Sequence, residues 1–184
     1  RQNTISYLMN RKVVLIGDSN VGKSSIITRI VQNTFYDNAA PTLAAAFVQF
    51  EMNYQNNQYR LNLWDTAGQE RYQQLMPQYF RKSDVALVVF DHTNKDSFIK
   101  MKQYFEQVNQ YTDGQCIKII IANKIDLTQK VTDEEKEETK ITLNVPIIGV
   151  SAKTGEGIQE LMNQIGQSLS EQQNHVIAPI MQTQ

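Results

Sequence analysis

The chain has 184 residues and a nearly neutral charge balance, with 18 Lys and Arg residues against 19 Asp and Glu residues. This length favours one domain with a continuous core, and the balance excludes a basic surface field that would hold nucleic acid or an anionic membrane. The only cysteine, Cys116, excludes an internal disulfide, and no apolar run reaches the roughly 18 residues of a membrane span, so we expect an intracellular protein that does not cross a membrane.

A glycine-rich loop follows the first predicted strand, residues 13–16, and opens a predicted helix. A strand, such a loop and a helix form the context that a phosphate-binding loop requires, because backbone N–H groups at a helix N-terminus surround the anion. Lys23 would add a positive charge, and the Ser24 hydroxyl would bind Mg²⁺. An ordinary glycine-rich turn is the alternative interpretation. The expected nucleotide contacts are Ser19, Asn20, Val21, Gly22, Lys23, Ser24 and Ser25.

A β-hairpin is predicted next, because residues 47–53 and 59–66 flank a polar turn rich in Asn and Gln. The two strands should pair antiparallel at one edge of the sheet. Their period-two alternation places two aromatic residues, Phe47 and Trp64, among polar residues on the solvent-facing side.

The second strand of this hairpin ends in Asp65-Thr66-Ala67-Gly68-Gln69. An Asp at a strand tip can bind a metal through water, and the Gly68 N–H can approach a terminal phosphate closely. Taken alone, an Asp at the end of a strand is more often a simple turn former. Its position after a phosphate-binding loop is what favours a role in metal binding.

Strands and helices alternate through the rest of the chain. Apolar runs predict strands over residues 85–90, 117–122 and 145–150. Apolar residues spaced by three and four predict helices over 98–108 and 158–169, and a capping box at Thr132 and Glu135 opens a helix over 133 to about 144. The pattern predicts a doubly wound α/β fold, with a mostly parallel six-stranded sheet and one antiparallel edge strand.

Two further polar motifs close the strands at 117–122 and 145–150. These motifs, Asn123-Lys124-Ile125-Asp126 and Ser151-Ala152-Lys153, should emerge at the carboxyl edge of the sheet beside the phosphate-binding loop. The Asp126 carboxylate offers two acceptors that match the N1–H and exocyclic amine of guanine, whereas adenine presents an acceptor there. Such a site can reject the wrong base by roughly 10⁴ to 10⁵. A loop of favourable turn residues is the alternative for Asn123 to Asp126 taken alone.

In this order, the segments resemble the Ras superfamily of small GTPases. The run Trp64-Asp65-Thr66-Ala67-Gly68-Gln69-Glu70-Arg71-Tyr72 is similar to the Rab branch, and Thr42-Leu43-Ala44-Ala45-Ala46-Phe47 is similar to endosomal Rabs. The resemblance covers residues 12–169 and implies a P-loop G domain over 12–170, between an N-terminal extension (1–11) and a flexible tail (171–184). Because the chain opens on Arg1 rather than Met, we expect the natural termini to lie beyond this sequence.

The resemblance also implies roles for individual residues. Phe35 would lie edge-on to the guanine, and Thr42 would complete the Mg²⁺ shell and contact the γ-phosphate. Gln69 would orient the attacking water beside Lys23. An aromatic triad of Phe47, Trp64 and Tyr79 would bind effectors, although these side chains could instead pack under a neighbouring helix or loop.

Three positions depart from the family pattern. Asn20 replaces a usual Gly or Ala, and Asn tolerates the positive φ that the loop needs. Ala39 replaces a Tyr that often closes over the phosphates. Ala44 replaces the usual Gly after Thr42, which stiffens that segment.

The function that the resemblance implies is a monomeric GTP/GDP switch with slow hydrolysis, because residues 32–41 contain no Arg that could act as a finger. Its partners would be an exchange factor, an activating protein and effectors, at the cytosolic face of endomembranes and in particular endosomes. Prenylated C-terminal cysteines would supply the membrane attachment, and this sequence has none near Gln184. A nucleotide-locked binding module without turnover and a P-loop kinase are the competing hypotheses.

Overall fold

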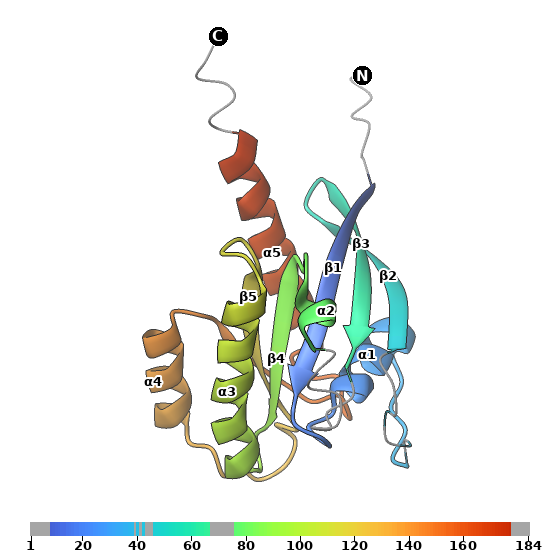
Figure 1. Ribbon diagram of the computed structural model, residues 1–184. Helices are drawn as coiled ribbons and strands as arrows, with labels where there is room; N and C mark the ends of the chain where they lie inside the picture. Colours follow the sequence, from blue (N-terminus) through green and yellow to red (C-terminus); the bar gives the residue numbers. More distant parts are fainter. Residues whose placement is uncertain (1–7, 39, 41, 43–45, 67–75, 178–184) are drawn as a thin grey trace.

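The computed structural model describes residues 8–38, 40, 42, 46–66 and 76–177 and has the predicted α/β architecture (Figure 1). In the described residues the strands are β1 (Leu8–Gly17), β2 (Ala46–Tyr54), β3 (Asn57–Asp65), β4 (Val85–Asp91), β5 (Ile117–Asn123) and β6 (Ile147–Val150). The helices there are α1 (Lys23–Gln32), α2 (Met76–Phe80), α3 (Lys95–Tyr111), α4 (Asp133–Leu143) and α5 (Ile158–Ile177). The sheet order is β2-β3-β1-β4-β5-β6, with only β2 antiparallel to its neighbour among the described pairs. The predicted fold class is therefore confirmed.

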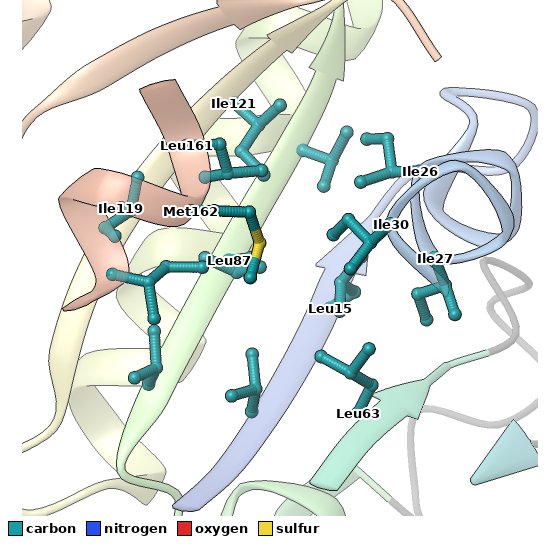
Figure 2. Packing of buried hydrophobic residues seen from close by; sticks show 14 of the residues in the cluster. Leu15, Ile26, Ile27, Ile30, Leu63, Leu87, Ile119, Ile121, Leu161 and Met162 are labelled. Carbon is teal, nitrogen blue, oxygen red and sulfur yellow. The ribbon is translucent and has the colours of Figure 1, made fainter. Parts of the chain in front are cut away.

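Apolar side chains cover both faces of the central strands, which explains their continuous apolar runs. In β1, Val13 and Leu15 face one cluster, while Val14 and Ile16 face the other. Figure 2 shows the first cluster, in which Leu15 lies among side chains from α1, α5 and the neighbouring strands. The second cluster packs against α3. This two-sided burial fixes the strands so that their carboxyl ends meet at one edge.

The β2–β3 hairpin has the alternation that the sequence predicts. Leu61 and Leu63 are buried, whereas Phe47 on the opposite side is 48% exposed. Phe47 pairs across the hairpin with Trp64, and Val48 pairs with Leu63. The register thus places Leu61 and Leu63 in the first cluster, whereas on the opposite side Phe47 is exposed and Trp64 is half-buried against the second cluster.

Helix α4 has the predicted N-terminus and end. The Thr132 hydroxyl accepts a hydrogen bond from the Glu135 N–H, and the Glu135 carboxylate accepts one from the Thr132 N–H. Asn144 ends the helix in the left-handed region with φ 51°. Pro146 follows two residues later and cannot continue the helix.

Two predicted boundaries differ from the structure. Strand β1 begins at Leu8, which pairs with Gln58, so residues 8–11 of the expected extension belong to the sheet. Helix α5 continues to Ile177 through the first part of the expected tail. Polar contacts rather than apolar periodicity accompany these last turns: Gln172 donates a hydrogen bond to the Gln115 carbonyl at 2.6 Å, and Gln is a good helix former.

None of the helices in the described ranges is long and apolar enough to span a membrane. Cys116 is buried, and burial raises the pKa of its thiol to about 11.

Gly166 lets α5 approach the β2 residue Tyr54. A Cβ atom at this position would lie 2.4 Å from Tyr54 Cγ. We predict that Gly166→Ala lowers the free energy of unfolding by about 1 kcal/mol, because overpacking of about 1–3 kcal/mol outweighs the helix propensity gained. In a Tyr54→Gly background, which also removes the Tyr54 Cβ that would lie 2.7 Å from the new Cβ, the same change should raise the free energy of unfolding, as measured by urea denaturation followed by circular dichroism.

Gly114→Ala is the matched control, since a Cβ there would meet no atom within 4 Å. An equal effect of Gly166→Ala in both backgrounds would show that Tyr54 does not require this glycine.

Candidate functional site

The loops that follow β1, β5 and β6 meet at the carboxyl edge of the sheet and enclose a pocket of about 400 Å³ together with residues after α1. Thirteen of the predicted site residues line it: Ser19, Asn20, Gly22, Lys23, Ser24, Ser25, Phe35, Thr42, Asn123, Lys124, Asp126, Ala152 and Lys153. Val21 and Ser151 are buried behind the wall. The predicted residues Gly68 and Gln69 lie outside the described residues.

The glycine-rich loop has two residues in the left-handed region, Asn20 with φ 61° and Gly22 with φ 94°. Asn is one of the few residues with a Cβ that enter this region readily. A Cβ at Gly22 would lie 2.3 Å from Asn123 Nδ2. Gly22 is therefore required both by its conformation and by the close approach of Asn123.

The Lys23 side chain returns over its own loop. Its Nζ donates hydrogen bonds to the carbonyls of Gly17, at 2.9 Å, and Asp18, at 2.8 Å. Burial lowers the pKa of Lys23 to about 8, against the opposing charges of Asp65 and Asp18. A bound phosphate would favour the charged amine, so the position suits an anion next to the loop.

Three oxygen-bearing side chains from separate segments meet beside Lys23. Ser24 Oγ lies 2.6 Å from Thr42 Oγ1 and donates a hydrogen bond to Asp65 Oδ2. Asp65 Oδ1 is buried and has no hydrogen-bond partner among the described residues. Burial raises the pKa of Asp65, although the Ser24 hydrogen bond and the Lys23 charge oppose this rise.

These oxygens fit a hard divalent cation. Mg²⁺ prefers one or two carboxylates with hydroxyl, water and phosphate oxygens over an all-protein cage. Within the described ranges no three His, Cys, Asp or Glu side chains gather into a denser metal site. The buried, unpartnered Asp65 oxygen is the observation that a cation would explain.

Asn123 connects the loops around the pocket and is only 1% exposed. Its Nδ2 donates to the Val21 carbonyl at 2.8 Å, and its Oδ1 accepts from the Ala152 N–H at 3.2 Å. One side chain therefore joins the phosphate-binding loop to the loop after β6. Both bonds are buried, where leaving one partner unpaired is costly.

The Asp126 carboxylate is fixed by a neighbouring loop. Ser151 Oγ donates to Asp126 Oδ1 at 2.6 Å and accepts from the Thr154 N–H at 3.0 Å. Ser151 is fully buried, so it orients Asp126 without itself lining the pocket. This arrangement presents a preoriented carboxylate to the pocket from a loop that is far from Lys23 in sequence.

Phe35 and Lys153 form the opposite rim of this end. Lys153 Nζ lies 6.0 Å from the centroid of the Phe35 ring and 3.2 Å from Asp37 Oδ1. Arg29 in α1 was not among the predicted site residues. Its guanidinium donates hydrogen bonds to the carbonyls of Ala152, at 2.8 Å, and Lys153, at 2.6 Å. The local sequence gave no signal for this role, because the partners of Arg29 lie more than 120 residues further along the chain.

The predicted aromatic triad is contiguous. The ring centroids of Phe47 and Trp64 are 5.2 Å apart, and those of Trp64 and Tyr79 are 6.2 Å apart. Lys12 Nζ lies 5.4 Å from the Trp64 ring centroid. Trp64 and Tyr79 are half-buried and Phe47 is exposed, so the three rings offer an aromatic surface continuous with the sheet edge.

A sequence model of the Ras family matches residues 12–171. The chain belongs to the Ras family. It is similar to Ras-related protein RabC of Dictyostelium discoideum, with 39% identity over 86% of this chain and 83% of the relative. Ras-related protein Rab-22A of Mus musculus is 35% identical over 88% of this chain and 84% of its own length. GTP-binding protein YPT53 of Saccharomyces cerevisiae is 36% identical over 86% of this chain and 76% of its own length.

These comparisons confirm the resemblance seen in the motifs. This small GTPase belongs to the Rab branch and hydrolyses GTP to GDP and phosphate.

Because Asn123 bridges two loops, we predict that Asn123→Asp destabilises this small GTPase by about 2–4 kcal/mol. The new carboxylate cannot donate to the Val21 carbonyl and places a buried charge 2.8 Å from it. Urea denaturation at pH 7 with saturating GDP measures the change. Asn62→Asp, at an exposed cross-strand pair with Gln49, is the control and should alter stability by less than about 0.5 kcal/mol. Equal effects of the two variants would contradict the bridging role.

Proposed function

We propose that this Rab-branch chain is a guanine-nucleotide switch that hydrolyses GTP slowly, binds effectors in the GTP state and regulates vesicle traffic. The observation that carries the proposal is that the buried Lys23 and the Ser151-held Asp126 line one and the same pocket. The first group suits a phosphate chain and the second suits the donor edge of guanine.

At the base end, Asp126 would accept hydrogen bonds from the guanine N1–H and exocyclic amine. Ser151 already fixes one of its oxygens, so little ordering remains to be done when the base binds. Phe35 and Lys153 would flank the ring, and Asn123 would hold the surrounding loops. Adenine would leave the carboxylate facing an acceptor, which is the physical basis for rejecting it.

At the phosphate end, Lys23 and the loop N–H groups from Ser19 to Ser25 would bind the β- and γ-phosphates. Ser24, Thr42 and Asp65 would hold Mg²⁺, with Asp65 acting through water. When bound, Mg²⁺ would neutralise charge on the phosphate oxygens. Thr42 lies in the segment before β2. Its contacts with Mg²⁺ and the γ-phosphate would depend on whether the pocket holds GTP or GDP.

Hydrolysis needs a water placed in line with the γ-phosphate and neutralisation of the charge that develops. We assign the positioning of water to Gln69, which lies outside the described residues. Residues 32–41 contain no Arg, so an activating protein would supply the missing positive charge. Without it, turnover should be about 10⁻⁴ per second.

Effectors would bind the aromatic surface of Phe47, Trp64 and Tyr79, whose rings form one continuous group. We place this GTPase at the cytosolic face of endomembranes, and the resemblance of residues 42–47 to endosomal Rabs favours endosomes. Membrane attachment would require a lipid anchor other than the buried Cys116. The chain would act as a monomer in complexes with an exchange factor, an activating protein and effectors.

Removal of the Asp126 carboxylate tests the assignment of the base. We predict that Asp126→Ala weakens GDP binding by about a thousandfold, because two charge-assisted hydrogen bonds are lost, while ATP remains a poor ligand. Titration calorimetry on nucleotide-free protein in Mg²⁺ measures the affinity for GDP and the affinity for ATP. Asp133→Ala on the exposed start of α4 is the control and should bind GDP like the wild type. Unchanged GDP affinity of Asp126→Ala would rule out this carboxylate as the guanine reader.

Gln69→Leu tests the hydrolytic step separately from binding. We expect single-turnover hydrolysis of labelled GTP to fall at least about tenfold, since Leu cannot orient water, while GTP affinity changes by less than about twofold. Gln159→Leu, on an exposed part of α5, should hydrolyse GTP at the wild-type rate. If wild-type protein turned over no GTP at all, the chain would be a nucleotide-locked binding module instead.

A further inference from the structure

Asp91 is a buried carboxylate at the end of β4 that the sequence motifs do not explain. It is the register partner of Asn123, the last residue of β5, and is 8% exposed. Its Oδ1 accepts hydrogen bonds from the Thr93 N–H, at 2.8 Å, and the Thr93 hydroxyl, at 2.7 Å. Its Oδ2 lies 2.6 Å from Lys124 Nζ. One oxygen therefore organises the local turn, and the other forms an ion pair with the residue after Asn123.

The ion pair determines which part of Lys124 faces the nucleotide pocket. Lys124 lines the pocket, whereas Asp91 lies behind its wall. With the ammonium held at Asp91, the aliphatic stem of Lys124 is the part left to form the pocket surface. An apolar stem is suited to pack on the face of a purine ring, while a released ammonium would be free to leave that position.

The backbone of Lys124 gives the ion pair a second consequence. Lys124 adopts φ 67°, in the left-handed region that residues with a Cβ enter at a cost in free energy. Such a conformation persists when surrounding contacts over-determine it. The ammonium anchor at Asp91 is one such contact, and Asp126, the guanine reader, follows only two residues later.

The electrostatics agree with a permanent ion pair. Burial works to raise the pKa of Asp91, but hydrogen bonds from Lys124 and Thr93 bring that pKa below its ordinary value. The carboxylate is thus charged at neutral pH. The side chains are 33% exposed for Lys124 and 11% exposed for Asp91, so solvent screens the pair only in part.

We propose that Asp91 is a positioning residue for the guanine nucleotide, acting through Lys124 to slow nucleotide release. The inference rests on the proposed function, in that the pocket must bind a guanine nucleotide. Asp91 touches no ligand itself. It sets the direction of Lys124 and supports the conformation of the segment that carries Asp126.

Asp91→Asn separates this role from the structural one, because an Asn side chain keeps an oxygen for Thr93 and replaces the charged oxygen that faces Lys124 with an uncharged NH₂ group, which cannot accept from the ammonium. We expect Asp91→Asn to release a fluorescent GDP analogue about tenfold faster than the wild type when the full chain is loaded with it and chased with excess GDP. This is the size expected for one partly screened charge-assisted hydrogen bond. Lys124→Met should also accelerate release.

A double-mutant cycle shows whether Asp91 acts through Lys124. In the Lys124→Met background, Asp91→Asn should change release by less than about twofold. A purely structural role would instead give the same acceleration in both backgrounds, and that result would overturn the proposal. If Asp91→Asn fails to fold, Lys124→Met still tests the proposal, because it leaves the hydrogen bonds between Asp91 and Thr93 in place. Release of GDP by Lys124→Met at the wild-type rate would also overturn the proposal.

The matched control is Asp84→Asn, at the residue just before the opposite end of β4. Asp84 accepts from the Lys12 N–H at 2.7 Å and forms an ion pair with Arg11 at 3.3 Å. Asp84→Asn should lower the unfolding temperature without changing GDP release.

Failure of the two hypotheses can be told apart in the same experiment. Wild-type protein that retains ATP as well as GDP would contradict the proposed function. Wild-type protein that retains GDP, together with wild-type release by Asp91→Asn, would contradict only the role of Asp91.

Discussion

The pocket depends on one buried amide, that of Asn123, which connects the phosphate-binding loop to the loop after β6. These loops are far apart in sequence, since Val21 and Ala152 are separated by more than 120 residues. Because Asn123 is almost fully buried, each of its hydrogen bonds is made in a medium where an unpaired partner is costly. Gly22 is part of the same constraint, since any side chain there would displace the amide.

The sheet explains why such a contact can form. Strands β1, β4, β5 and β6 run parallel and are covered on both faces by apolar clusters, so their carboxyl ends stay in a fixed register. Asp91 is paired with Asn123, and Asn123 with Val150. The polar residues that follow these strands are consequently brought to one edge. Apolar packing thus supplies the placement, and short polar contacts supply the final orientation of each functional group.

Local motifs made much of this predictable. The glycine-rich loop, the Asp126 and Ser151 motifs and the hairpin alternation each depend on neighbours in sequence, so the fold class and the residues gathered around the pocket could be predicted. Arg29 and Asp91 could not, because their partners, Ala152 and Lys124, lie 123 and 33 residues further along the chain. The extent of α5 was missed for a similar reason, as polar contacts rather than apolar periodicity accompany its last turns. Gly68 and Gln69 stay predictions.

The hairpin links the phosphate end of the pocket to the aromatic surface over a very short path. Asp65, whose carboxylate meets Ser24 and Thr42, directly follows Trp64 in β3. Across the hairpin, Ala46 pairs with Asp65 and Phe47 pairs with Trp64. The rings of Phe47 and Trp64 lie one residue further along the same paired strands than Ala46 and Asp65. A contact that the phosphate site gains or loses at Thr42 or Asp65 is therefore made close to these rings. A switch of the proposed kind therefore needs no long-range pathway, because the Asp65 carboxylate and two of the three rings, Phe47 and Trp64, are carried by the same two strands.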